Sequence, residues 1–115
     1  MNNWTAEELA FRCERLSVRL EKLAQKFVQI ADLSQDLTNS EVVLRMIRES
    51  KQLLELTEID LDVDSAFELA QIQRQLSRWH MHWSDAWVQN SGFSKISRLA
   101  QVWSDRIREM TGVLV

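Results

Sequence analysis

The sequence predicts an all-α protein, and three observations support this fold class. The 115 residues include no proline and only two glycines, so few residues suit the tight turns of a β-rich fold. Apolar residues recur at helical intervals in four segments. At three of the four starts, serine or threonine precedes glutamate by three positions, the spacing of a capping box. We therefore expect residues 1–115 to form a single domain, an antiparallel four-helix bundle whose first and third helices are long and whose other two are shorter.

The first predicted helix begins at Thr5, which can form a capping box with Glu8. Its apolar positions alternate between spacings of four and three, the heptad pattern of one continuous helix of about 30 residues. These positions are Leu9, Cys13, Leu16, Leu20, Leu23, Phe27 and Ile30. Small residues, including Ala24 and Ala31, line one flank of the stripe, so we expect another helix to approach closely there.

The second predicted helix follows the pair Thr38 and Glu41 and has about 17 residues. It leads into the segment "LTEIDLDVD", in which apolar and acidic residues alternate. A period of two predicts extended backbone. We expect Ile59, Leu61 and Val63 to pack inward while the intervening aspartates stay in water.

The third predicted helix begins with the pair Ser65 and Glu68 and runs for about 25 residues, until Gly92 gives a stop signal. Ser94 can cap the fourth, which has about 17 residues. The predicted inner face of the third helix is Leu69, Ile72, Leu76, Trp79, Trp83, Ala86 and Trp87. That of the fourth is Ile96, Leu99, Ala100, Trp103, Ile107 and Met110.

The stretch "RWHMHWSDAW" holds three of the five tryptophans and both histidines. On a helix its tryptophans share the apolar face, so we interpret them as core. The alternative is an aromatic pocket between the third and fourth helices that binds a flat or apolar molecule. It would be lined by Trp79, Trp83, Trp87, Trp103 and His80. The two histidines point in different directions on a helix, so we do not expect them to share a metal ion.

The acidic run "DLDVDSAFE" matches part of an EF-hand calcium loop. The matching positions are Asp60, Asp62, Asp64 and Glu68. Ser65 stands where such loops need glycine, and Gln71 stands where they need a bidentate glutamate. We favour a connector whose aspartates stabilise the start of the next helix, with a calcium site as the weaker alternative.

No catalytic, phosphate-loop or di-iron motif is present, so we expect neither enzyme activity nor a cofactor. Cys13 lies on the apolar stripe, which suggests an inert core thiol. The net charge is −3 and the basic residues are scattered, so nucleic acid is not an expected partner. No apolar run is long enough for a membrane span and no signal peptide is apparent, which predicts a cytoplasmic protein.

A second apolar stripe suggests association with another helix. Trp4, Phe11 and Val18 recur every seven residues opposite the core stripe of the first helix, and Met81 and Val88 do so on the third. We expect a homodimer, or docking of another helical protein, through these residues. The alternative is ordinary surface, or N-terminal residues folded back over Phe11. The sequence thus favours a non-catalytic, self-associating interaction or adaptor protein, with a small-molecule binding protein as the alternative.

Overall fold

The computed structural model describes residues 5–89 and 94–114. Within these ranges the chain forms six α-helices, one 3-10 turn and no β-strand, so the all-α prediction is confirmed. The helices are α1 (Ala6–Cys13), α2 (Leu16–Leu33), α3 (Ser40–Glu58), α4 (Val63–Met81), α5 (Trp83–Gln89) and α6 (Ser94–Leu114), and the 3-10 turn η1 spans Leu37–Asn39.

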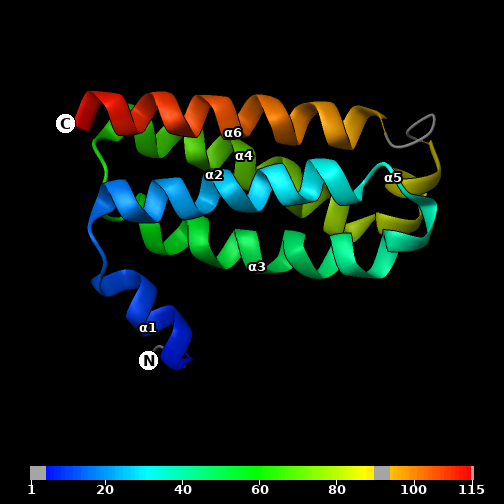
Figure 1. Cartoon of the computed structure of the whole chain (residues 1–115), viewed down its shortest axis with the longest axis horizontal. Helices are drawn as coiled ribbons and strands as arrows, with labels where there is room; N and C mark the ends of the chain where they lie inside the picture. Colours follow the sequence, from blue (N-terminus) through cyan, green and yellow to red (C-terminus); the bar gives the residue numbers. More distant parts are fainter. Residues whose placement is uncertain (1–4, 90–93, 115) are drawn as a thin grey trace.

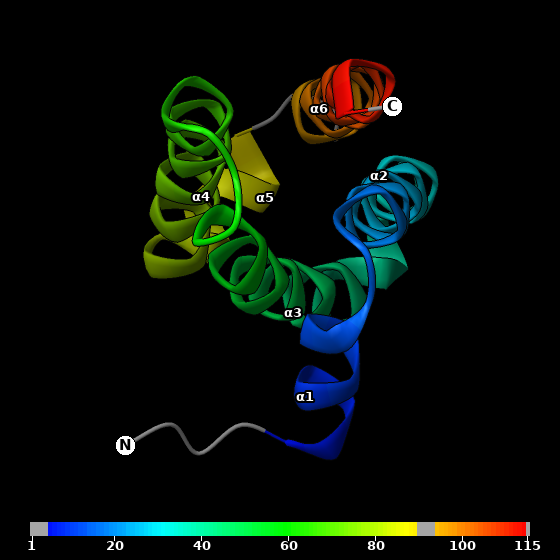
Figure 2. The same ribbon diagram turned by 90° about the vertical axis from the view of Figure 1, so that its left-hand side faces the viewer.

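The four longest helices lie side by side along the long dimension of the molecule and alternate in direction (Figure 1). Seen from one end, α3 lies between α2 and α4, and α6 lies beside α2 (Figure 2). Helix α1 projects near the start of α2, and α5 lies at the opposite end of the molecule (Figure 1). The expected pairing of long and short helices is wrong, because α2, α3, α4 and α6 have 18, 19, 19 and 21 residues.

The predicted first helix is broken at Glu14 and Arg15, whose backbone is extended. The break turns α1 toward α3, and Phe11 becomes 6% exposed. In a straight helix Phe11 would lie opposite the core stripe and stay in water, so its burial favours the break. The same turn leaves Leu9 and Cys13 exposed, and the prediction that they belong to the core is wrong.

The segment expected to be extended is instead a helix end, a short turn and a helix start. Helix α3 continues to Glu58, and Val63 already begins α4. Asp62 caps α4 by accepting a hydrogen bond from the Ser65 backbone N–H at 3.1 Å, so the cap lies three residues before the predicted one. Ile59 and Val63 are exposed, which contradicts the expectation that they pack inward.

Two other predicted helix features differ in the structure. The predicted cap at Thr38 is absent: Asp36 caps the 3-10 turn η1 by accepting from the Thr38 backbone N–H at 2.9 Å, and α3 begins after Asn39 without a side-chain cap. The predicted third helix is interrupted at His82, whose φ of −122° and ψ of 43° are not helical. Helix α5 therefore follows as a separate short segment.

Helices α2 and α6 pack closely along a line of small residues. Ser104 Oγ donates to the Ala24 carbonyl and Ser97 Oγ donates to the Ala31 carbonyl, both at 2.9 Å. Ala24, Ala31 and Ala100 are buried at this contact. The expectation that a helix approaches the small flank is confirmed.

Candidate functional site

Large aromatic side chains separate α4 from α6. The rings of Trp79 on α4 and Trp103 on α6 have centroids 5.4 Å apart, and Phe27 of α2 meets Trp103 edge-on at 5.7 Å. An indole is much wider than the alanine and serine side chains between α2 and α6. We attribute the wider α4–α6 seam to this difference in side-chain size.

A groove of about 400 Å³ follows the outer side of this seam, and we call it the α4–α6 groove. Its apolar wall includes Ile72 and Phe67 from α4 and Leu99 and Trp103 from α6. Phe67 is 62% exposed, although it is large and apolar. The remaining lining residues are Glu68, Gln71, Gln75 and Arg106.

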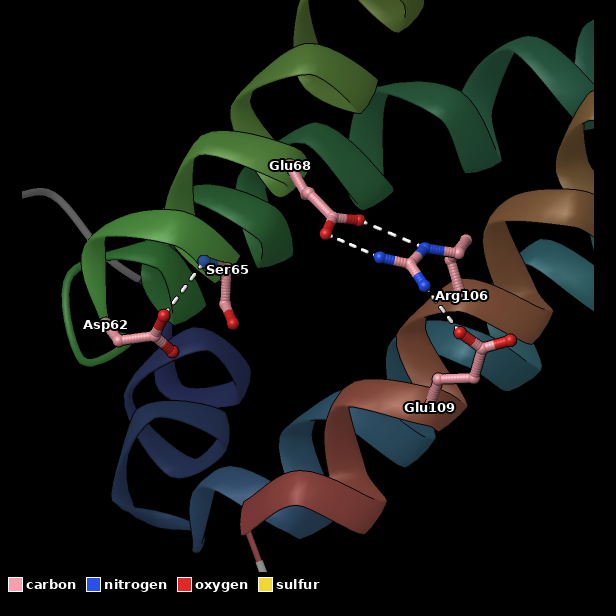
Figure 3. Close-up of polar contacts among 5 residues, drawn as sticks. All are labelled: Asp62, Ser65, Glu68, Arg106 and Glu109. Atoms are coloured by element: carbon pink, nitrogen blue, oxygen red, sulfur yellow. Dashed lines mark hydrogen bonds and ion pairs between the residues drawn. The ribbon is translucent and has the colours of Figure 1, made fainter.

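A charged cluster formed by two groove residues, Glu68 and Arg106, together with Glu109, joins α4 to α6 (Figure 3). Arg106 Nε and Nη2 donate to Glu68 Oε2 and Oε1 at 3.1 and 2.5 Å, and Nη1 donates to Glu109 Oε2 at 2.5 Å. The hydrogen bonds that Arg106 donates to Glu68, and then those to Glu109, raise the pKa of Arg106 above its ordinary value. The cluster links α4 to α6 and neutralises the guanidinium at the rim.

Two further apolar side chains lie beside the groove residues on the same helices. Val63 precedes Phe67 by one turn and is 84% exposed. Val102 follows Leu99 by three positions, which places them on neighbouring parts of α6, and it is also exposed. Exposed apolar patches with polar rims are typical of interaction surfaces.

The structure brings the predicted pocket tryptophans together as two ring pairs. Trp79 contacts Trp103 as described, and the centroids of Trp83 and Trp87 lie 5.2 Å apart. Trp83 is only partly buried, and its Nε1 donates to Ser40 Oγ at 3.0 Å. At these separations no ligand fits between the rings of either pair. His80 faces α3 instead, with Nδ1 3.2 Å from Lys51 Nζ.

The four residues of the EF-hand match are not arranged around a common point. Their contacts differ from one residue to the next. Asp60 pairs with Arg19 at 2.9 Å and with Arg12 at 3.9 Å. Asp62 caps α4, Asp64 is exposed, and Glu68 binds Arg106. Across residues 5–89 and 94–114, no group of three or more His, Cys, Asp or Glu side chains is arranged to hold a metal ion.

The predicted interface residues do not form one outer stripe. Phe11 is buried within the chain, so its assignment to an outer face is wrong. Trp4 lies outside the described residues. Val18, Met81 and Val88 are exposed, as expected, but the interruption at His82 places Met81 on α4 and Val88 on α5.

Sequence reasoning missed Phe67. A usable signal was present: Val63 and Phe67 are four residues apart, and neither belongs to the inner stripe of the third predicted helix. The groove also needs the spacing set by Trp79 and Trp103, which no pattern on a single helix reveals.

The chain matches no family model, no curated protein and no solved structure. Among the described residues, no helix combines the length and apolar character that a membrane crossing requires.

Proposed function

We propose that this protein is a non-catalytic helical interaction protein that self-associates through the α4–α6 groove. The observation that carries the proposal is the exposed Phe67 beside an apolar groove on the same face. In the proposal, α2, α3, α4 and α6 act as an antiparallel four-helix bundle that presents this face. We place the protein in the cytoplasm, where a reducing environment suits the single, exposed Cys13.

A second copy suits this face because a twofold interface must be complementary to itself. Phe67 projects from one wall of the groove, so two molecules related by a twofold axis can each place Phe67 against the apolar wall of the other. Arg106 is already paired with Glu68 and Glu109, so the approach of two copies does not bring unpaired arginines together. The amides of Gln71 and Gln75 supply polar contacts at the rim.

The test is the molecular mass in solution, measured by sedimentation for the wild type and two variants. Phe67→Glu should convert a dimer into a folded monomer. Burying a polar group without a hydrogen-bond partner costs roughly 2 to 7 kcal/mol, and burying an unpaired carboxylate costs more. Val88→Glu is the control, since Val88 is 77% exposed on α5 and is not a groove residue. It should remain a dimer.

A wild type that is monomeric at high concentration contradicts self-association. A dimer broken by Val88→Glu but not by Phe67→Glu moves the interface from the groove to the residues first predicted, Met81 and Val88. Circular dichroism of each variant shows whether the loss of mass comes from unfolding.

Trp103 in the groove wall favours a second candidate function, the binding of a flat, apolar small molecule. The probe for this test is anilinonaphthalene sulfonate. A monomeric wild type that binds one equivalent, with loss of binding in Trp103→Leu but not in Val88→Leu, would support this function over self-association.

A further inference from the structure

The seam between α3 and α4 holds a polar pocket that shares no residue with the α4–α6 groove. Its volume is about 210 Å³, large enough for one small polar group. Helix α3 contributes four of the lining residues and α4 contributes two. They are Arg48, Lys51, Gln52, Glu55, Gln73 and His80.

Lys51 has an unusual partner in this pocket. Its Nζ lies 3.2 Å from His80 Nδ1, and an ammonium group can only donate hydrogen bonds. His80 Nδ1 therefore accepts, so the ring is neutral and carries its proton on Nε2. Burial, followed by the positive charges of Lys51 and Arg48, lowers the pKa of His80 and keeps the ring in this state.

The lining carries more positive than negative charge. Lys51 is hydrogen-bonded to the neutral imidazole of His80, so this contact does not cancel its charge. No ion pair is found for Arg48 within the described part of the chain. Glu55, one turn after Lys51, is the single carboxylate among the lining residues. Two cations and one carboxylate leave a net positive pocket between two helices.

We propose that this pocket is a binding site for a small oxyanion of the size of phosphate, held by Lys51 and Arg48. A guanidinium matches the geometry of phosphate oxygens, and an ammonium adds a compact point charge. Glu55 opposes the anion and weakens the site. The proposal does not depend on self-association, because neither cation belongs to the α4–α6 groove.

Inorganic phosphate is the probe, and the imidazole proton signals in an NMR titration are the readout. Phosphate should shift the His80 signals in a saturable manner and raise the pKa of His80, because the anion offsets the two neighbouring cations. His82 is exposed outside the pocket and serves as an internal reference whose signals should stay unchanged.

Charge-changing variants test which side chains hold the anion. Arg48→Gln and Lys51→Gln should each weaken phosphate binding at least tenfold, whereas Glu55→Gln should strengthen it. Arg98→Gln removes the same charge from an exposed position on α6 and should have no effect. Circular dichroism checks that each variant is folded, and Arg48 is itself exposed, so its replacement leaves the core intact.

Three results would overturn the site: a His80 response that does not saturate, an equal response of His82, or equal weakening by Arg98→Gln and Arg48→Gln. The last two indicate general attraction to positive charge rather than a pocket.

Discussion

At the scale of single residues, Arg19 shows how a buried charge is satisfied. The side chain is buried between α2 and the end of α3, where Nη1 donates to the Leu56 carbonyl at 3.0 Å and to Asp60 Oδ2 at 2.9 Å. Carbonyls in the last turn of a helix lack partners within the helix, so Arg19 also supplies a cap for α3. Its Nε atom is buried without a hydrogen-bond partner, which makes the bonds at Nη1 more important.

Removing the charge of Asp60 should therefore destabilise the fold. We expect Asp60→Asn to lower the free energy of unfolding by about 1 to 3 kcal/mol, because Arg19 stays buried without its counter-ion. Asp64→Asn makes the same change at an exposed position without such a partner and should cost less. Urea unfolding of both variants measures the difference. Equal losses would show that Asp60 acts only as part of a general acidic surface.

Glu58, the last residue of α3, gives the clearest pH dependence. Partial burial and then repulsion from Glu55 raise its pKa from 4.5 to about 7. With the Gln73 amide oriented so that its NH₂ group faces Glu58, that nitrogen donates a hydrogen bond to Glu58 Oε1 at 2.9 Å. This hydrogen bond reduces the cost of ionising Glu58. The folded state binds this proton more tightly than the unfolded state, so the contribution to stability is full below pH 4.5 and is lost as the pH rises through 7.

Glu58→Gln should remove this loss. We expect the variant to be more stable than the wild type at pH 8, by about 1 kcal/mol after allowance for solvent screening, with no difference near pH 4.5. Glu55→Gln should give a smaller gain, because it removes the repulsion but not the burial. Thermal unfolding at the two pH values provides the comparison. A constant difference at both would mean that Glu58 acts through packing.

At the scale of elements, the contact between α2 and α6 depends on small side chains. Ala24 is fully buried there, and its carbonyl accepts the hydrogen bond of Ser104. A larger residue at this position must push the two helices apart and break that hydrogen bond.

Ala24→Leu should therefore destabilise the protein by about 1 to 3 kcal/mol, although leucine is more hydrophobic than alanine. Ala70→Leu places the same side chain on an exposed face of α4 and should be nearly neutral. Denaturant unfolding separates the two cases. A neutral Ala24→Leu would show that the α2–α6 contact can widen without cost.

Periodicity predicted where helices occur but not where they break. The inner faces of α3, α4 and α6 follow the apolar stripes of the sequence because residues three and four positions apart share one face of an unbroken helix. The breaks at Glu14 and His82 lack glycine and proline, and the first is favoured by the contact of Phe11 with a distant helix. The groove was equally hidden, since it requires the sizes of Trp79 and Trp103 on two different helices.

At the scale of the whole molecule, stability is not distributed evenly. Helix α1 has one buried residue, Phe11, whereas α2 has seven. Segments with few buried contacts open locally without global unfolding.

Hydrogen exchange should show this difference directly. We expect the amides of α1 to exchange far faster than those at the centre of α2, and Phe11→Ala to remove most of the remaining protection in α1 while leaving α2 unchanged. A match between α1 and α2 in the wild type would mean that α1 unfolds only with the rest of the protein.

The serine-to-carbonyl hydrogen bonds between α2 and α6 can form only late in the synthesis of the chain. They join residues 66 and 80 positions apart, whereas α3 and α4 are neighbours in the chain. At about 5 to 20 residues per second, the ribosome reaches Ser104 roughly 4 to 16 seconds after Ala24. During that interval α3 and α4 can pair, but α2 presents an uncovered apolar face to chaperones and proteases. A translation product that stops before α6 keeps that face uncovered, which marks it for degradation by the cell's quality-control machinery.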